Sequence, residues 1–276
     1  MSDYHHETFF IFLIACHTIL NSNRKMEKIT TFIINLEEDR ARKEHMQNML
    51  MTMSDMFAYS FVSAVNGRRM TEHEIGGRFD TALAYKRYGR PLNRGEVGCT
   101  LSHYQCYEKI AKLPQNYALV LEDDITILGD MKEIANLIPY INRDEPAIIF
   151  LSGDYWYYRI RKISGHLQLA SVYDAVGAYA YLINSAAAKR ILEKNELPAC
   201  VADHWSLYRR QGIRLYAVYP YMVDANIESF SSSINQAYFG EIRHNMPWKY
   251  RIDSYRLSLV KRILLQAGKF VSKIRK

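Results

Sequence analysis

The stretch Tyr117-Ala118-Leu119-Val120-Leu121-Glu122-Asp123-Asp124 decides how this chain is interpreted. Its first five residues form a short apolar run, typical of a fully buried parallel strand and too short for a helix. Three carboxylates follow at once, and burying them is costly unless a positive group compensates. Ligands of open α/β sheets bind at the carboxyl ends of strands, so the cluster predicts a divalent-cation site that holds a diphosphate. The alternative is a solvated acidic turn before a strand at 125–128.

The flanking sequence alternates between expected strands and expected helices. We expect further strands at 29–36, 57–65, 147–151, 178–183 and 214–218, and helices at 38–51, 96–113, 185–192 and 203–210. Residues 66–94 predict a long loop with short helices, and residues 154–166 are aromatic and basic. The order predicts an α/β fold with a Rossmann-like, mostly parallel sheet flanked by helices.

The charge of this chain is concentrated at one end. The 276 residues carry a net charge of +7, and residues 254–276 contain seven basic residues and no acidic residue. The rest of the chain is therefore neutral, with 29 basic and 29 acidic residues, which argues against a nucleic-acid-binding domain. The four cysteines show no CxxC pairing, which favours buried reduced thiols in a cytoplasmic protein.

Three parts are expected along the chain: an N-terminal extension at 1–25, a catalytic domain at 26–253 and a basic amphipathic helix at 254–276. Residues 1–25 include an apolar run too short for an ordinary membrane span, and a weak anchor is the alternative. The terminal helix is expected to place its apolar residues on one face, widened by Ile263 and Phe270: Leu257, Val260, Leu264, Ala267, Val271 and Ile274. This pattern predicts docking on an anionic membrane surface, with packing against the catalytic domain as the alternative.

Six segments together resemble glycosyltransferase family 25, of the lipooligosaccharide galactosyltransferase type, over residues 29–235. The most specific is Gly95-Glu96-Val97-Gly98-Cys99-Thr100-Leu101-Ser102-His103. The others are Ile33-Ile34-Asn35-Leu36 with Arg42 and Met46, Leu121-Glu122-Asp123-Asp124, Gly177 with Tyr181-Leu182-Ile183, Asp203-His204-Trp205, and Pro220 with Ser233-Ile234. Two positions depart from the family pattern: Ala41 stands where an acid is usual, and Asn66 replaces the Asp of Asp-Gly.

The resemblance implies a GT-A type fold and an inverting, metal-dependent transfer from a nucleotide sugar to a glycan. The donor is expected to be UDP-galactose and the acceptor a lipid-linked lipooligosaccharide glycan, which makes the chain a β-galactosyltransferase. It is expected to be cytoplasmic and peripheral at the inner face of the cytoplasmic membrane. The alternatives are a UDP-glucose-dependent glucosyltransferase, or a non-catalytic protein that binds a nucleotide sugar or an anionic surface. No nucleic acid partner is expected.

The acidic cluster supplies the expected ligands of Mn²⁺ or Mg²⁺. Asp124 is the first choice for direct coordination, and Glu122 shares its face of the extended chain and is the second. Asp123 points the other way and is expected to cap local backbone beside the donor. A third ligand is not identifiable, and His204 and His244 are weak candidates.

The resemblance places the remaining donor contacts on other segments. The nucleotide sugar is expected to contact residues of the first strand, of the following helix, of the turn after the second strand and of the 96–113 helix: Asn35, Leu36, Arg42, Asn66, Gly67, Ser102 and His103. For Ser102 and His103 the alternative is a packed helix with a satisfied histidine. Glu96 is alternatively a first-turn residue that offsets the helix dipole.

An inverting transfer also needs a base for the acceptor hydroxyl. Asp203 is the first candidate, and its alternative role is an N-cap for the helix that follows. Asp154, after the expected strand at 147–151, is the second candidate. The aromatic residues 155–158 are expected either to stack on sugar rings or to form a partly buried loop.

Overall fold

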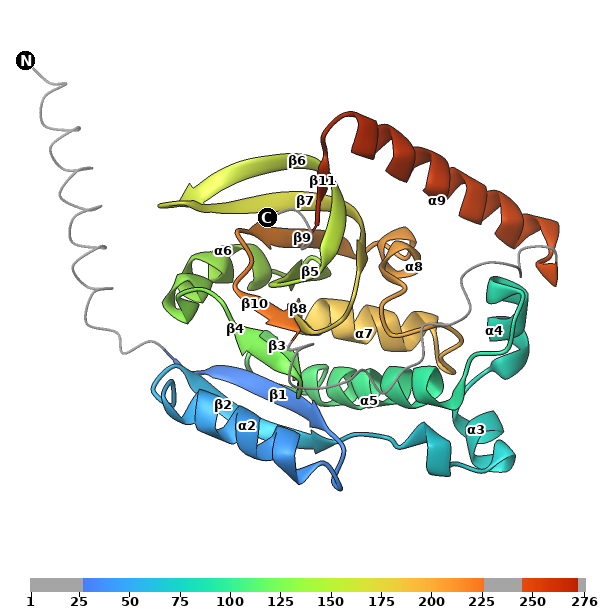
Figure 1. Ribbon diagram of the computed structural model, residues 1–276, viewed down its shortest axis with the longest axis horizontal. Coiled ribbons are helices and arrows are strands. Elements are labelled where there is room, and N and C mark those ends of the chain that lie inside the picture. The colour runs from blue at the N-terminus through green and yellow to red at the C-terminus, as the bar shows by residue number, and fades with distance from the viewer. Residues whose placement is uncertain (1–26, 226–244, 273–276) are drawn as a thin grey trace, which may run out of the picture.

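The computed structural model describes residues 27–225 and 245–272 (Figure 1). The expected extension at 1–25 lies outside the described residues, as do Ser233, Ile234, His244 and Ile274. The described chain builds a nine-stranded sheet of order β11-β6-β7-β9-β5-β8-β3-β1-β2, with helices on both of its faces. A second, two-stranded sheet pairs β10 with β4.

The strands match most of the expected ranges within one or two residues. The large sheet contains β1 (Ile29–Asn35), β2 (Phe57–Ser63), β3 (Tyr117–Glu122), β5 (Ala147–Phe150), β6 (Asp154–Ser164), β7 (Leu167–Val176), β8 (Ala180–Asn184), β9 (Arg214–Tyr219) and β11 (Phe270–Val271). The small sheet contains β4 (Ile125–Ile127) and β10 (Val223–Ala225).

The sheet is mixed rather than mostly parallel. Strands β3, β1 and β2 are parallel, as are β5 and β9. Strand β8 runs antiparallel between β3 and β5, and β6, β7 and β11 add antiparallel pairs at one edge. The alternative of an aromatic loop at 155–158 is wrong, because these residues belong to the long strand β6. Aromatic and β-branched side chains favour a pleated, half-buried strand, and that preference prevails here over the basic residues.

The helices and 3₁₀ segments cover both faces of the sheet. They are α2 (Arg40–Met51), η1 (Gly67–Arg69), α3 (Glu72–Arg78), α4 (Thr81–Tyr88), α5 (Arg94–Ile110), η2 (Met131–Leu137), α6 (Ile138–Ile141), α7 (Ser185–Lys194), α8 (Trp205–Arg210) and α9 (Trp248–Gln266). A small hydrophobic cluster joins α3, α4 and α5. Of the two larger cores, one lies between the sheet and α5, α7 and α8, and the other lies between the sheet and α2, η2 and α6. Within the described ranges, no helix combines the length and apolar composition needed to cross a bilayer.

Strand β3 sends alternate side chains into these two cores. Ala118 and Val120 belong to the core under α5, whereas Leu119 and Leu121 belong to the core under α2. Because successive side chains of a strand point to opposite faces, Glu122 leaves the strand on the side of α5. The first helix residues of α5 are fixed by a capping box, in which Asn93 and Glu96 exchange hydrogen bonds.

The C-terminal segment differs from its expected form. Helix α9 begins at Trp248 and ends at Gln266, and the chain then turns at Gly268, whose φ is 69°. Phe270 and Val271 pair with Trp156 and Tyr155 of β6, so they form an edge strand instead of a helix face. A single amphipathic helix over 254–276 is therefore wrong, because a left-handed glycine and an open sheet edge end it early.

Candidate active site

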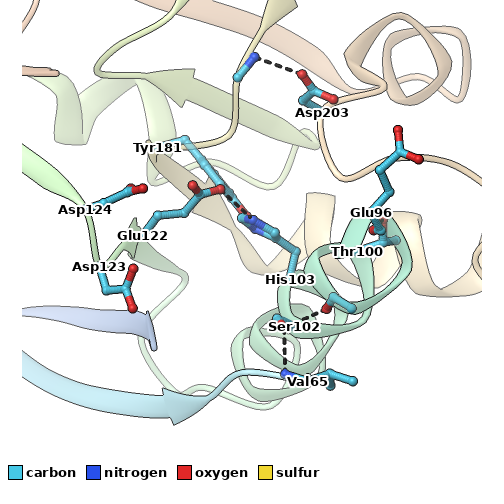
Figure 2. A network of polar contacts seen from close by, with 12 residues as sticks. Val65, Glu96, Thr100, Ser102, His103, Glu122, Asp123, Asp124, Tyr181 and Asp203 are labelled. Carbon is cyan, nitrogen blue, oxygen red and sulfur yellow. Dashed lines mark hydrogen bonds and ion pairs between the residues drawn. The ribbon is translucent and has the colours of Figure 1, made fainter. Parts of the chain in front are cut away.

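Three acidic side chains leave the end of β3 in two directions. Glu122 is the last residue of the strand, and Asp123 and Asp124 begin the turn to β4. Figure 2 shows Glu122 and Asp124 extended toward the same side, with Asp123 turned away from them. The alternation expected for the cluster is confirmed, and it divides the acids into a pair and a single residue.

Asp123 joins the end of β3 to the two elements beside it. Its Oδ2 accepts a hydrogen bond from the side-chain amide of Asn35 at 2.7 Å, and its Oδ1 accepts one from Arg42 at 2.9 Å. Burial raises the pKa of Asp123, and the bonds from Asn35 and Arg42 oppose that rise. We had expected Asp123 to cap local backbone, but it binds side chains of β1 and α2.

Arg42 is the positive group that the acidic cluster requires. Its Nη1 lies 3.3 Å from Oδ2 of Asp124 and its Nε lies 3.3 Å from Oδ2 of Asp39. Asp39 also caps α2, because it accepts a hydrogen bond from the backbone N–H of Arg42. The guanidinium is thus held against the carboxyl end of β3, and its expected place near the donor diphosphate stays a prediction.

In the described part of the chain, only one of the two carboxylate oxygens of Asp124 is paired, the Oδ2 that faces Arg42. Among the described residues, its Oδ1 is buried and has no hydrogen-bond partner. Burial raises the pKa of Asp124 to about 6; repulsion from Glu122 adds to the rise and attraction to Arg42 opposes it. A buried oxygen without a donor, beside a second carboxylate, suits a hard divalent cation that prefers oxygen ligands. Glu122 and Asp124 are therefore the residues that fit Mn²⁺ or Mg²⁺.

Glu122 is held in place by hydrogen bonds that run through three buried side chains, His103, Tyr181 and Tyr107. Nε2 of His103 lies 3.3 Å from Oε1 of Glu122, and Nδ1 of His103 lies 2.7 Å from the hydroxyl of Tyr181. Tyr181 in turn donates to the hydroxyl of Tyr107 at 3.2 Å. Figure 2 shows His103 between Tyr181 and Glu122. His103 is buried, so it positions Glu122 instead of facing the substrate as the resemblance implied.

Cys99 lies one helical turn before His103 and shares this corner. One ligand atom each of Cys99, His103 and Glu122 lies within 4.8 Å of the others. Burial raises the pKa of the Cys99 thiol well above its usual value, and the charge of Glu122 adds to the effect. The thiol is thereby kept protonated, and this mixed sulfur and nitrogen set suits Mn²⁺ or Mg²⁺ less well than the two carboxylates.

Two other residues of α5 have structural roles. Ser102 is buried; its hydroxyl donates to the carbonyl of Gly98 at 2.7 Å and accepts from the backbone N–H of Val65 at 2.8 Å. Its expected donor contact is corrected, because it ties the loop after β2 to α5 (Figure 2). Glu96 pairs with Arg90 at 2.6 Å and completes the capping box, as the first-turn alternative had it.

The loops after β1 and β2 meet beside the acidic end of β3. The side-chain amide of Asn66 donates to Glu38 at 2.6 Å, and its carbonyl oxygen caps the short η1 segment. Gly67 has no room for a side chain, since an added Cβ would lie 1.8 Å from the carbonyl oxygen of Arg94. Leu36 follows β1 and is half-buried. These residues lie at the edge predicted for the nucleoside, where parallel strands end.

Asp203 does not cap the helix that follows it. The N-cap position of α8 is His204, with no side-chain cap bond, whereas Oδ2 of Asp203 accepts from the backbone N–H of Gly177 at 2.9 Å. Gly177 has a φ of 89°, and its carbonyl accepts from Nε1 of Trp205 at 2.9 Å. Burial raises the pKa of Asp203, and the charge of Glu122 adds to the rise. A carboxylate with a raised pKa is suited to take a proton near neutral pH.

Tyr179 shows that the separate acids converge on one region. Its pKa is raised to about 12, first by burial and then by the charges of four carboxylates, which are those of Glu122, Asp203, Asp124 and Asp154. Glu122, Asp154 and Asp203 come from three different segments, which lie 32 and 49 residues apart along the chain. Tyr179 itself was missed; the signal in the sequence was an aromatic residue two positions after Gly177, which belongs to one of the matching segments.

The remaining candidates are the two histidines considered as a third metal ligand and the aromatic residues 155–158. His204 bonds to the hydroxyl of Tyr88 at 2.6 Å, and burial lowers its pKa to about 3. This contact within the fold makes it a poor third metal ligand, and His244 lies outside the described residues. In the aromatic run, Tyr155 is buried and donates to the carbonyl of Val218, so its role is in the core. Tyr158 is exposed and packs edge-on against Tyr173.

Comparison with known proteins adds an independent observation. A family-wide sequence model described as "Glycosyltransferase family 25 (LPS biosynthesis protein)" matches residues 28–206. The matched residues run from the start of β1 to the start of α8, and they include Glu122, Asp124 and Asp203.

Individual relatives match over parts of their length. A "Glycosyltransferase 25 family member" of Aedes aegypti is 36% identical over 104 residues, which are 37% of this chain and 17% of the relative. "Procollagen galactosyltransferase 1-B" of Xenopus laevis is 33% identical over 144 residues, which are 44% of this chain and 23% of the relative. "Putative glycosyltransferase R655" of Acanthamoeba polyphaga mimivirus is 26% identical over 253 residues, which are 83% of this chain and 74% of the relative. This chain therefore covers less than a quarter of the first two relatives.

Proposed function

Because this chain belongs to glycosyltransferase family 25, we propose that it transfers a hexose from a UDP-sugar to a glycan acceptor at the carboxyl ends of β1, β2 and β3. The observation that carries this proposal is the paired exit of Glu122 and Asp124 toward one side, with Oδ1 of Asp124 buried and unbonded among the described residues. Such a pair is costly in an empty fold and becomes favourable opposite a dication.

Glu122 and Asp124 would hold Mn²⁺ or Mg²⁺, which supplies Lewis acidity toward the oxygens of the diphosphate. Arg42 contacts both Asp123 and Asp124, so it keeps the acidic end of β3 oriented. His103 performs the same task for Glu122 from the opposite side. The protein thereby positions its two carboxylates before the donor arrives.

Asp203 is the proposed base for the acceptor hydroxyl, and transfer would then invert the configuration at the donor carbon. Its raised pKa, caused first by burial and increased by the charge of Glu122, supports this role. The bond from the Gly177 N–H holds the carboxylate in one orientation, which general-base catalysis requires. Asp154 is the second candidate, because its charge acts on the same tyrosine, Tyr179.

Galactose is the proposed donor sugar, supported by the name of the galactosyltransferase relative. UDP-glucose is the alternative. For the acceptor we propose a lipid-linked glycan of the lipopolysaccharide type, supported by the description of the matching family. Its site of action would be the inner face of the cytoplasmic membrane.

The test is release of UDP by the purified, metal-stripped protein from a panel of UDP-sugars, with Mn²⁺ added or withheld. We expect Mn²⁺-dependent release that is fastest with UDP-galactose. Binding of UDP-galactose without release, even when glycan acceptors are added, would instead identify a non-catalytic binding protein. Release that is equally fast in EDTA would remove the metal from the proposal.

A further inference from the structure

The outward face of α9 carries a continuous stripe of exposed apolar side chains. The stripe consists of Trp248, Ile252, Tyr255, Leu259 and Ile263, which are 75%, 40%, 56%, 58% and 54% exposed. Their spacing of three or four residues places them within about 40° of one line along the helix. Singly exposed apolar residues need no explanation, but an aligned stripe along the whole of a 19-residue helix does.

The orientation of this stripe is fixed by contacts on the opposite face. Leu264 is buried, and Nζ of Lys261 pairs with Asp174 at 2.9 Å and lies 3.5 Å from the ring centre of Trp156. After the helix, Phe270 stacks on Trp156 with ring centres 4.5 Å apart. The buried Leu264 belongs to the face that the sequence predicted for a membrane, so that face turns toward β6, whereas Ile263 at its margin lies in the exposed stripe.

Basic residues border the stripe on both sides. On a helical projection, Lys249 and Arg256 flank one side and Arg251 and Arg262 flank the other, each within about 80° of the stripe. Asp253 is the only acid in α9 and projects about 120° away, toward the packed face. The outward half of the helix therefore presents apolar residues between two rows of positive charge.

The elements that pack against α9 extend this charge. Helix α9 contacts β6 and α4. Strand β6 exposes Arg159 and Lys162, and α4 exposes Lys86. Arg161 of β6 stacks on Tyr140 of α6. Strand β7 adds Asp174, which is buried and paired with Lys261. Helix α4 contains no acid, and the single acid of β6, Asp154, is half-buried and acts on Tyr179 in the candidate active site. The surroundings therefore favour a negatively charged partner.

We propose that the outward face of α9 docks on an anionic lipid bilayer, with the helix lying in the plane of the interface. Its apolar stripe would enter the boundary between headgroups and acyl chains, while the flanking Lys and Arg side chains contact the headgroups. Trp248 and Tyr255 are residue types that prefer this boundary. The helix spans about 28 Å, which gives an extended contact along the surface. This inference is independent of the proposed transfer, because docking needs no sugar substrate.

Flotation of the full chain with vesicles tests the proposal. Vesicles of phosphatidylcholine with about 30% phosphatidylglycerol, which have a negative surface potential of about −30 mV or more, are compared with vesicles of pure phosphatidylcholine. Both are tested at low and at high salt. We expect the wild type to float with the anionic vesicles at low salt and to be released by high salt. The double substitution Leu259→Ser with Ile263→Ser should weaken binding at least about tenfold. Failure of the wild type to bind anionic vesicles overturns the proposal.

A matched control separates the stripe from general surface hydrophobicity. Met51 and Leu128 are also exposed apolar residues, 62% and 53% exposed, and lie outside α9. The double substitution Met51→Ser with Leu128→Ser should leave vesicle binding unchanged, and thermal melts should show both double variants folded. An equal loss in the control overturns the assignment to α9. The proposal is also overturned if the wild type does not bind vesicles but dimerises without lipid, and if Leu259→Ser with Ile263→Ser makes it monomeric. The stripe would then be a dimer interface.

Discussion

Nε2 of His103, in the middle of α5, lies 3.3 Å from Oε1 of Glu122 at the end of β3. A helix residue and a strand residue nineteen positions apart thereby form one unit, since the hydroxyl of Tyr181 holds the other ring nitrogen of His103. The carboxylate that is proposed to bind the cation therefore has a fixed direction before any ligand arrives.

Replacing His103 tests this positioning role. His103→Ala should weaken Mn²⁺ binding by about 10- to 100-fold, as removal of groups that orient metal ligands does, and should lower activity with it. His103→Gln retains a donor of similar reach and should restore most of the Mn²⁺ affinity. Isothermal titration with Mn²⁺ measures both. If the alanine variant is less stable but binds Mn²⁺ normally, the role of His103 is confined to packing.

Replacing Asp124 should stabilise the metal-free fold while destroying activity. The pKa of Asp124 rises from 3.8 to about 6 on folding, so between these values the folded protein holds the extra proton. Stability from this group is present below about pH 4 and is lost as pH rises through 6, where ionised Asp124 costs up to about 3 kcal/mol. Asp124→Asn should therefore raise the free energy of unfolding above pH 6 and leave it unchanged below pH 4.

Urea denaturation across this pH range measures the effect, and Mn²⁺ provides the control. Added Mn²⁺ should stabilise the wild type by mass action and leave Asp124→Asn unaffected. A variant that is less stable than the wild type at pH 8 without metal would contradict the pKa shift of Asp124. A variant that Mn²⁺ stabilises as much as the wild type would remove Asp124 from the cation site.

The substitution Asp203→Asn distinguishes two roles of Asp203, as the proposed base and as the acceptor that holds the turn at Gly177. The amide oxygen of asparagine can still accept from the Gly177 N–H, so the turn and the UDP affinity should be preserved. The transfer rate should fall about 10²- to 10⁴-fold, as for loss of a general base. Pre-steady-state rates with a soluble acceptor, beside UDP binding, give the comparison. A wild-type rate would assign Asp203 to the turn and make Asp154 the candidate base.

Two glycines make a matched test of how α5 is seated. An added Cβ at Gly98 would lie 2.5 Å from the carbonyl oxygen of Val65 and 2.6 Å from the backbone N of Gly67, so Gly98→Ala should destabilise the fold by about 1 to 3 kcal/mol. Gly76 in α3 has nothing within 4 Å of that position, and Gly76→Ala should be neutral or stabilising by up to about 1 kcal/mol. Chemical denaturation measures the free energy of unfolding of both variants. Equal changes in the two variants would contradict the close contact at Gly98.

The sequence predicted the strands near the candidate site well, because short apolar runs such as 117–121 have few other stable forms in a domain of this size. It also predicted that Glu122 and Asp124 would share a side, which follows from the period of an extended chain. It did not predict the partners of Asp123 or Ser102. Asn35 and Val65 lie 88 and 37 residues away from them, and the topology that unites them is not a local property.

The errors share one physical origin. A loop was one alternative for residues 155–158, and Val271 was predicted as part of a helix, yet both contribute to one sheet edge, in β6 and β11. Pairing between distant strands determined their structure, and local propensity cannot reveal such pairing. For α9, periodicity identified a helix face but could not tell which of two apolar faces would pack, because both repeat every three or four residues.

The proposed cation and donor site at Glu122 and Asp124 is tested most directly by calorimetric titration of UDP-galactose into the metal-stripped protein, with and without saturating Mn²⁺. We expect binding that strengthens at least about tenfold with Mn²⁺ in the wild type and does not respond to Mn²⁺ in Asp124→Asn. UDP-galactose binding of equal strength in EDTA and in Mn²⁺, or a Mn²⁺ response that survives in Asp124→Asn, would contradict the account.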